Sequence, residues 1–262
     1  MQNNFYFINN FSNIYKKPSN KSEVTSQIIY GEKFKILAKN KNWIKIKTLF
    51  DNYKGFIKNS KYIEKFSPNY KVSSLKAKIY KKPGIGTSSW LPLASKLSVI
   101  EQNRNYVKIE KNKWIKKADI KKINHKENNF TKIFKKFLDV KYVWGGKTFK
   151  GIDCSALLQI FYCYNNSFYP RDTKDQIKYT KKNSKKRLFK KGDIIFWKGH
   201  VAMCLNSKQL IHAYGPERKV IIMPIIETIN RIQKTAKLKV KKISRIKSVS
   251  YTHLTLPTKV EV

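Results

Sequence analysis

Acidic residues are scarce in this sequence. Its 262 residues include 16 Asp and Glu against 57 Lys and Arg, which gives a formal net charge of +41. Such an excess is able to attract a polyanion such as nucleic acid, anionic lipid or wall polymer. The lysines, however, are spread along the whole chain, and no zinc-finger or RNA-binding motif accompanies them. We therefore interpret the charge as compositional and expect no specific nucleic-acid partner.

Cysteines and long apolar runs are also few. The three cysteines are odd in number and too few for a disulfide scaffold, which fits a reducing compartment. No apolar run is long enough to span a bilayer. Residues 1–5 lack the basic and apolar segments of a secretory signal. We expect no transmembrane segment and a cytoplasmic location.

Lysine is missing from residues 249–258, although it is frequent elsewhere in the chain. This stretch resembles the read-through translation of a transposase sequencing adapter. We therefore treat residues 249–262 as a non-native tail and exclude them from the prediction of the fold. For the same reason His253 receives no functional role.

What the chain does contain is an internal repeat. The sequence Ile-Tyr-Lys-Lys-Pro occurs at residues 14–18 and again at 79–83, and residues 40–47 resemble residues 103–110. Two copies in matching order predict two similar modules. Apolar and polar residues alternate within each copy, between turns rich in Pro, Gly and Asn, which predicts short strands. We predict small all-β barrels at residues 1–66 and 69–123, similar to bacterial SH3-like domains.

The pattern changes after these modules. Apolar residues at 130, 133, 134, 137 and 138 have the spacing of an amphipathic helix. Later runs at 194–197, 201–205 and 209–214 have the character of buried strands. Helices followed by strands predict an α+β domain, which we place at residues 126–240.

Cys154 stands where a glycine-rich turn enters a helical run. Asp153 is a suitable N-cap, so the thiol is predicted at the positive end of the helix, where the thiolate is favoured. A thiolate is the nucleophilic form of cysteine. The alternative, a small buried residue that happens to begin a helix, is equally compatible with this segment alone. Cys163 falls on the opposite side of the same helix, and it and Cys204 are expected to be core thiols.

A catalytic cysteine needs an imidazole to accept its proton. His125 lies in a polar stretch between domains and is expected to be a surface residue. His200 and His212 lie on two neighbouring predicted strands downstream of Cys154. We predict that His200 takes the proton from Cys154 and that His212 bonds its far ring nitrogen and fixes the tautomer.

These residues belong to six short motifs, at 142–146, 153–155, 170–172, 191–197, 199–201 and 211–213. Their order and spacing resemble those of the NlpC-type cysteine peptidases, papain-like enzymes that cut bacterial cell-wall peptides. The resemblance covers about residues 130–232. With two SH3-like modules in front, the chain is most similar to the branch of murein dipeptidyl peptidases. The resemblance implies cleavage of the γ-D-glutamyl bond to a diamino acid, in peptides with a free N-terminal L-Ala.

The resemblance also implies roles for individual residues. It gives Cys154 as nucleophile, His200 as base and His212 as the orienting third residue. It further implies substrate-binding residues, which are Tyr142, Asp153, Ser155 and, in the first module, Tyr53. A carboxylate at position 153 is able to pair with a free α-amine. One departure is Ala156, where the family usually has glycine. The sequence has no metal-ligand spacing, and we expect no metal and no cofactor.

Two other functions compete with a peptidase. The SH3-like modules would serve a protein that binds wall or peptide while its catalytic domain is vestigial. The retention of both His200 and His212 argues against this, because an inactive site is free to lose them. Nucleic-acid binding by charge alone is the third hypothesis, and a collapse of binding at modest salt would mark it as incidental.

Overall fold

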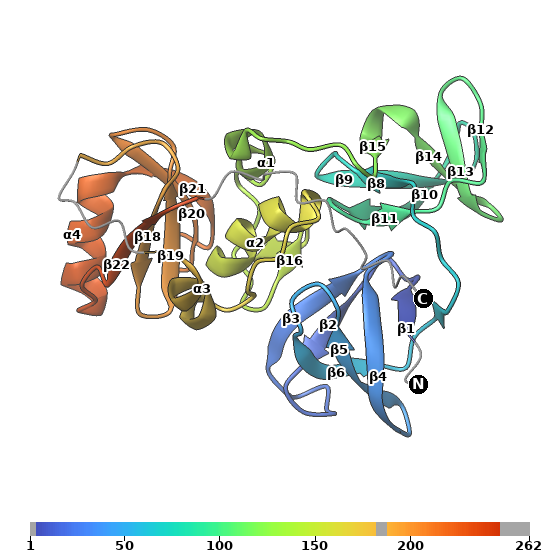
Figure 1. The fold of residues 1–262 in the computed structure, drawn as a ribbon, viewed down its shortest axis with the longest axis horizontal. Coiled ribbons are helices and arrows are strands. Elements are labelled where there is room, and N and C mark those ends of the chain that lie inside the picture. Colours follow the sequence, from blue (N-terminus) through green and yellow to red (C-terminus); the bar gives the residue numbers. More distant parts are fainter. Residues whose placement is uncertain (1–3, 182–187, 247–262) are drawn as a thin grey trace, which may run out of the picture.

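The computed structural model describes residues 4–181 and 188–246. The predicted non-native tail at 249–262 lies outside them. Three bodies follow one another along the chain: two strand-rich modules and an α+β domain at the other end of the molecule (Figure 1). Among the described residues, no helix is long and apolar enough to cross a membrane.

The first module is a seven-stranded antiparallel sheet with the order β3-β2-β6-β5-β4-β1-β7. Its apolar side chains alternate along the strands, and the inward set forms one core around Phe7, Ile14 and Ile46. The strands are β1 (Asn4–Phe7), β2 (Phe11–Tyr15), β3 (Val24–Ile29), β4 (Lys33–Asn40), β5 (Trp43–Thr48), β6 (Lys54–Lys58) and β7 (Tyr62–Ile63).

The second module divides its strands between two sheets, of order β10-β9-β14-β13-β12 and β11-β8-β15. A short 3₁₀ helix at Lys117–Asp119 precedes its last strand. The strands are β8 (Tyr70–Val72), β9 (Lys76–Lys82), β10 (Ile85–Pro92), β11 (Lys96–Leu97), β12 (Glu101–Gln102), β13 (Tyr106–Glu110), β14 (Lys113–Lys116) and β15 (Ile120–Lys122).

The internal repeat has a direct structural meaning. The first copy gives the order β3-β2-β6-β5-β4, and the second gives β10-β9-β14-β13-β12, so each repeated segment occupies the same place in its sheet. The repeated Asn-rich segments form the hairpin turns, where Lys41 has a positive φ of 49° and the Asn103 side chain accepts from two backbone amides. The predicted strand-rich character of both repeats is confirmed.

The third body combines helices with a five-stranded antiparallel sheet of order β21-β20-β19-β18-β22. The α+β class predicted from the sequence is therefore confirmed. Its elements are α1 (Phe130–Lys135), β16 (Lys147–Thr148), β17 (Gly151–Ile152), α2 (Cys154–Tyr164), α3 (Thr173–Tyr179), β18 (Asp193–Trp197), β19 (His200–Cys204), β20 (Gln209–Tyr214), β21 (Lys219–Pro224), α4 (Ile225–Ala236) and β22 (Lys242–Arg245).

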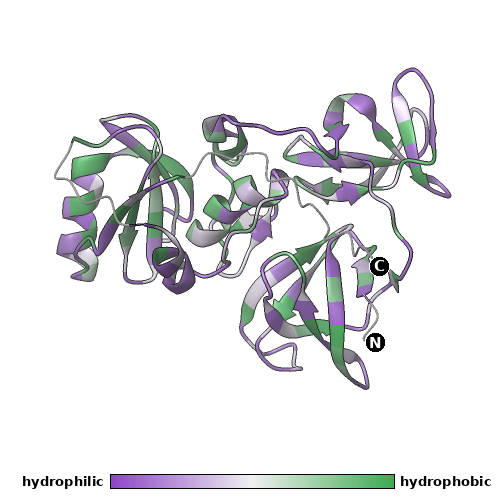
Figure 2. Ribbon diagram, viewed as in Figure 1, coloured by the Kyte–Doolittle hydropathy of each residue, from purple (hydrophilic) through white to green (hydrophobic). Residues whose placement is uncertain are grey.

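Helices cover both faces of this sheet, which explains its continuous apolar strands. Ile194 and Phe196 of β18 join the core around α2, whereas Ile195 and Trp197 join the core beneath α4. Every residue of α2 is buried, including the polar Ser155 and Gln159, while α4 is apolar mainly on its inner face (Figure 2). The arrangement places α2 between the sheet and the two strand-rich modules (Figure 1).

Candidate active site

Cys154 is the first residue of the buried helix α2. The hairpin of β16 and β17 leads into Asp153, whose extended backbone and side chain cap the helix by accepting from the Ala156 amide at 2.8 Å. The predicted N-cap is thus confirmed. The thiol lies at a helix N-terminus, as the sequence indicated, and its side chain is 6% exposed.

The environment of the thiol corrects one sequence-based expectation. Burial, reinforced by the Asp153 carboxylate, raises the pKa of Cys154 to about 12, although the Val201 amide and the Thr173 hydroxyl donate to the sulfur and oppose this shift. The helix N-terminus was expected to favour the thiolate. Here burial outweighs it, so the sulfur needs a base at the moment of reaction.

His200 and His212 form a hydrogen-bonded pair on strands β19 and β20. His200 Nε2 lies 2.9 Å from His212 Nδ1, which leaves Nδ1 of His200 as the nitrogen outside this bond. Burial lowers the pKa of His200 to about 4. His212 is 1% exposed, and burial, followed by the charges of His200 and Arg231, lowers its pKa well below the usual value. Both rings are therefore neutral at pH 7, the form in which an imidazole can accept a proton.

The thiol and the imidazole pair meet at the start of β19. Cys154 Sγ lies 4.0 Å from the carbonyl oxygen of Gly199 and accepts from the amide of Val201, so it touches both backbone neighbours of His200. No hydrogen bond joins Sγ to the His200 ring within residues 4–181 and 188–246. The two groups are adjacent but not bonded in this conformation, and such bonds often tighten only when substrate is present.

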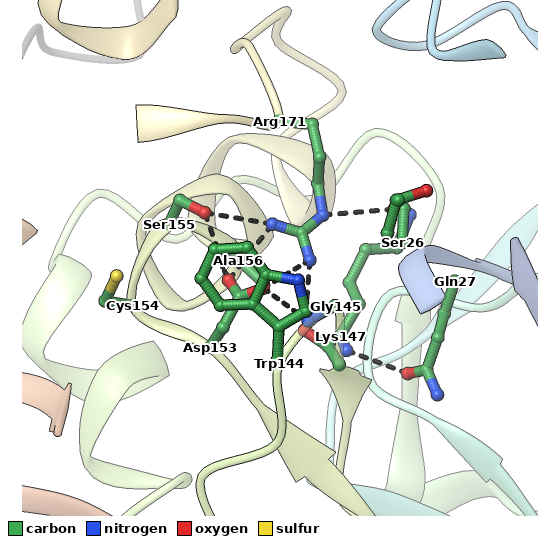
Figure 3. A network of polar contacts seen from close by, with 12 residues as sticks. Ser26, Gln27, Trp144, Gly145, Lys147, Asp153, Cys154, Ser155, Ala156 and Arg171 are labelled. Atoms are coloured by element: carbon green, nitrogen blue, oxygen red, sulfur yellow. Dashed lines mark hydrogen bonds and ion pairs between the residues drawn. The ribbon is translucent and has the colours of Figure 1, made fainter. Parts of the chain in front are cut away.

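Asp153 and Ser155 flank the thiol, and both are tied to Arg171. The guanidinium donates to both carboxylate oxygens of Asp153, at 3.0 and 2.7 Å, and to Ser155 Oγ at 2.9 Å. It also reaches the first module, where its Nε donates to Ser26 Oγ at 3.0 Å (Figure 3). Arg171 is 3% exposed, so this is a desolvated bidentate pair.

This network changes the expected role of Asp153. Its carboxylate also accepts from the Gly145 and Ala156 amides at 3.0 and 2.8 Å, and from Ser155 Oγ at 3.0 Å. Five donors occupy about four lone-pair positions. The structure therefore does not support Asp153 as the partner of a substrate amine. Asp153 instead fixes the start of the helix that carries Cys154.

A cavity of about 440 Å³ opens beside Cys154, between the third body and the first module. Tyr53 lies in its wall, where its hydroxyl donates to the Thr25 carbonyl at 3.4 Å, and Asp153 and Ser155 line it as well. Tyr142 packs against Gly215, and burial, followed by the charge of Cys154, raises its pKa. The structure thus brings all the predicted residues into one region, with Tyr142 beside the thiol and the others at the cavity or in the histidine pair.

The cavity also contains residues that received no role from the sequence. Asp172 lies at the start of α3 without capping it, and burial raises its pKa although Arg171 opposes this. Glu23 of the first module accepts from Trp144 Nε1 at 2.9 Å, and both residues line the cavity. Asp172 belongs to a motif that could be found in the sequence. Glu23 could not be found this way, because it joins the cavity only when the first module packs against the third body.

Comparison with known proteins agrees with this architecture. Residues 139–238 match the model of the NlpC/P60 family, and residues 10–64 match that of the bacterial SH3 domain. The chain is 23% identical over 232 residues to the γ-D-glutamyl-L-lysine dipeptidyl-peptidase of Bacillus subtilis (strain 168), covering 79% of this chain and 77% of that protein. It is also 23% identical over 232 residues to dipeptidyl-peptidase 6 of Lysinibacillus sphaericus, covering 77% of this chain and 84% of the relative.

The fold is shared with a solved protein. A crystal structure of an NlpC/P60 family protein from Bacillus cereus ATCC 10987 matches 92% of this chain and 99% of its own, with a TM-score of 0.76. The two sequences are 18% identical, so this likeness concerns the fold alone. It extends across the strand-rich modules as well as the α+β domain.

Proposed function

Since residues 139–238 form an NlpC/P60 domain with a bacterial SH3 domain in front of it, we propose that the protein is a cysteine peptidase acting on murein-derived peptides. The proposed scissile bond joins the γ-carboxyl of D-Glu to an L-diamino acid. The observation that carries this proposal is the position of Cys154 at a helix start, against the strand that begins with His200 and its partner His212.

The chemistry follows from these three side chains. His200 takes the thiol proton of Cys154 as the sulfur attacks the γ-carbonyl carbon of D-Glu. The protonated imidazole then gives that proton to the leaving amine of the diamino acid, and a thioester remains on the sulfur. Water, deprotonated by His200, hydrolyses the thioester and releases L-Ala-γ-D-Glu. The His200 bond to His212 supports the imidazolium during both steps.

The cavity supports a substrate with a free amino end. Two carboxylates, Glu23 and Asp172, line it together with Tyr53, and Asp172 is half-buried with no helix cap to satisfy it. Glu23 already pairs with Lys16 at 3.3 Å, so Asp172 is the carboxylate to which a bound ammonium group would bring a charged donor. A peptide with an acetylated or glycan-linked end would leave Asp172 desolvated and unpaired, at a cost in binding. Dipeptide release is the natural outcome when the pocket ends at this amine.

The relatives' names agree with this specificity. Two of them are a γ-D-glutamyl-L-lysine dipeptidyl-peptidase and a dipeptidyl-peptidase. We therefore propose that a dipeptide with a free amine fills the cavity and that the bond after D-Glu reaches Cys154. The diamino acid then lies beyond the cavity.

The experiment that tests this function compares two cysteines of one helix. Cys154→Ala should abolish release of L-Ala-γ-D-Glu from L-Ala-γ-D-Glu-L-diamino acid, while Cys163→Ala, at another buried thiol of α2, should retain cleavage. Products are identified by mass spectrometry, and circular dichroism confirms that both variants fold. Equal activity in the two variants would exclude Cys154 as the nucleophile.

A further inference from the structure

His212 makes a contact that the proposed chemistry does not use. Its Nε2 lies 3.3 Å from the thioether sulfur of Met223 on strand β21, within hydrogen-bonding range for sulfur. The ring is buried and stacks on Tyr214, with centroids 4.6 Å apart and 12° between the planes. The far side of His212 is thus enclosed by apolar and aromatic groups, and the sulfur is the atom that its Nε2 meets.

The tautomers of the two histidines depend on each other. In the bond between His200 Nε2 and His212 Nδ1, one nitrogen donates and the other accepts. If His200 donates, its Nδ1 carries no proton and is able to accept one from Cys154, and His212 carries its own proton on Nε2. If His212 donates, His200 is protonated on Nδ1 and cannot act as the base.

Met223 distinguishes these two arrangements. A thioether has no proton to give and only accepts, weakly. In the first arrangement Nε2–H of His212 donates to the sulfur and Nδ1 accepts from His200, so both nitrogens of the His212 ring are satisfied. In the second, the bare lone pair of Nε2 faces the lone pairs of the sulfur, and a buried acceptor is left without a donor. The contact therefore favours the arrangement in which His200 is a base.

We propose that Met223 is a positioning residue: by accepting the Nε2 proton of His212, it holds His200 in the tautomer whose Nδ1 can deprotonate Cys154. The inference rests on the proposed role of His200. Met223 acts through the rings of His212 and His200 and does not itself contact the substrate.

The groups around His212 keep its ring neutral, which both arrangements require. Arg231 of α4 lies over the Tyr214 ring, with its Cζ 5.5 Å from the ring centroid, and pairs with Glu217 at 2.7 Å. A cation near the ring disfavours a second proton on His212. The ring is thereby kept neutral, with one proton and one lone pair, as a relay between a donor and an acceptor requires.

The direct test is the protonation pattern of the His212 ring, measured by nitrogen NMR of the full chain labelled in its histidines. The proposal expects Nε2 protonated and Nδ1 bare in the wild-type protein. It expects a mixture of both tautomers in Met223→Leu, which keeps the volume but removes the acceptor. A wild-type ring protonated on Nδ1, or an unchanged pattern in Met223→Leu, would overturn it.

Kinetics provide the second readout. Met223→Leu should lower kcat by the factor by which the Nε2-protonated fraction of His212 falls, about two- to tenfold, with KM nearly unchanged. Met223→Gln, whose amide oxygen is able to accept, should recover most of the loss. The matched control is Met203→Leu, the same exchange at a buried methionine of β19, where we expect no more than about a twofold change.

These measurements separate the inference from the proposed function. Neither the tautomer nor the rate of Cys154 alkylation by iodoacetamide requires a peptide substrate. If no murein peptide is cut but Met223→Leu changes the tautomer and slows alkylation, the positioning role stands while the substrate assignment fails. If Met223→Leu and Met203→Leu lower kcat equally, with the tautomer intact, Met223 only fills space and the inference is refuted.

Discussion

The two strand-rich modules have the same strand order but different contacts with the active site. The first contributes Glu23, Thr25 and Tyr53 to the cavity and is joined to the peptidase domain by a buried ion pair of Glu32 with Lys147, at 2.7 Å. The second supplies no residue to that cavity in the described chain and instead touches the far end of α2, where Lys71 Nζ donates to the Tyr164 carbonyl at 2.6 Å.

This difference shows how a duplicated module acquires separate roles. The strand order is set by alternation and turns, which both copies retain. What a module contributes to function depends on a few side chains at its edges, and these differ. The first module lines the cavity that we propose binds substrate, whereas the second contacts the end of α2 opposite to Cys154. Three predictions test this contrast.

The largest expected effect is on stability, at the ion pair that joins the first module to the peptidase domain. Lys147→Met would leave Glu32 as an unpaired buried charge, and we expect a loss of about 3–5 kcal/mol in unfolding free energy, measured by urea denaturation. Lys108→Met removes the exposed partner of Glu101 in the second module and should cost at most about 1 kcal/mol. Adding Glu32→Gln to Lys147→Met should recover much of the loss. Equal effects of the two single variants would contradict the contrast.

A smaller effect is expected on substrate binding. Glu23→Gln removes a carboxylate from the cavity, and we expect KM for a free-amine peptide to rise about tenfold, equivalent to about 1.4 kcal/mol. Glu101→Gln, in the second module, should leave KM unchanged. The comparison is made by steady-state kinetics with one tripeptide. A KM insensitive to Glu23→Gln would remove the first module from amine recognition.

A pH dependence of stability is expected to arise in the second module. Burial, followed by the charges of Lys126 and Lys96, lowers the pKa of Lys71 to about 7. Since an unfolded lysine titrates near pH 10.4, the unfolded chain holds the extra proton between these values, and stability should rise with pH across that window. Lys71→Met should flatten this rise in urea midpoints between about pH 7 and 10. Lys108→Met should keep it, and a slope unchanged in Lys71→Met would show that another group causes it.

Much of this architecture could be predicted from local sequence. The repeats, the helix start at Cys154 with its Asp153 cap, and the paired histidines all follow from spacing within short segments. What could not be predicted depends on segments far apart in the chain. Arg171, from a separate loop, donates to the Asp153 carboxylate, and Glu23 lines the cavity from another module. The pKa of Cys154 is raised by burial, which depends on how all the elements around the thiol pack.

The most direct test of the account is product analysis on two matched substrates. Mass spectrometry should show release of L-Ala-γ-D-Glu from the free-amine L-Ala-γ-D-Glu-L-diamino acid by the full chain. The same peptide with its amine acetylated should be cut at least about a hundredfold more slowly, because the half-buried Asp172 carboxylate loses its charged partner. Equal cleavage of both peptides, or a cut at another bond, would contradict the proposed site.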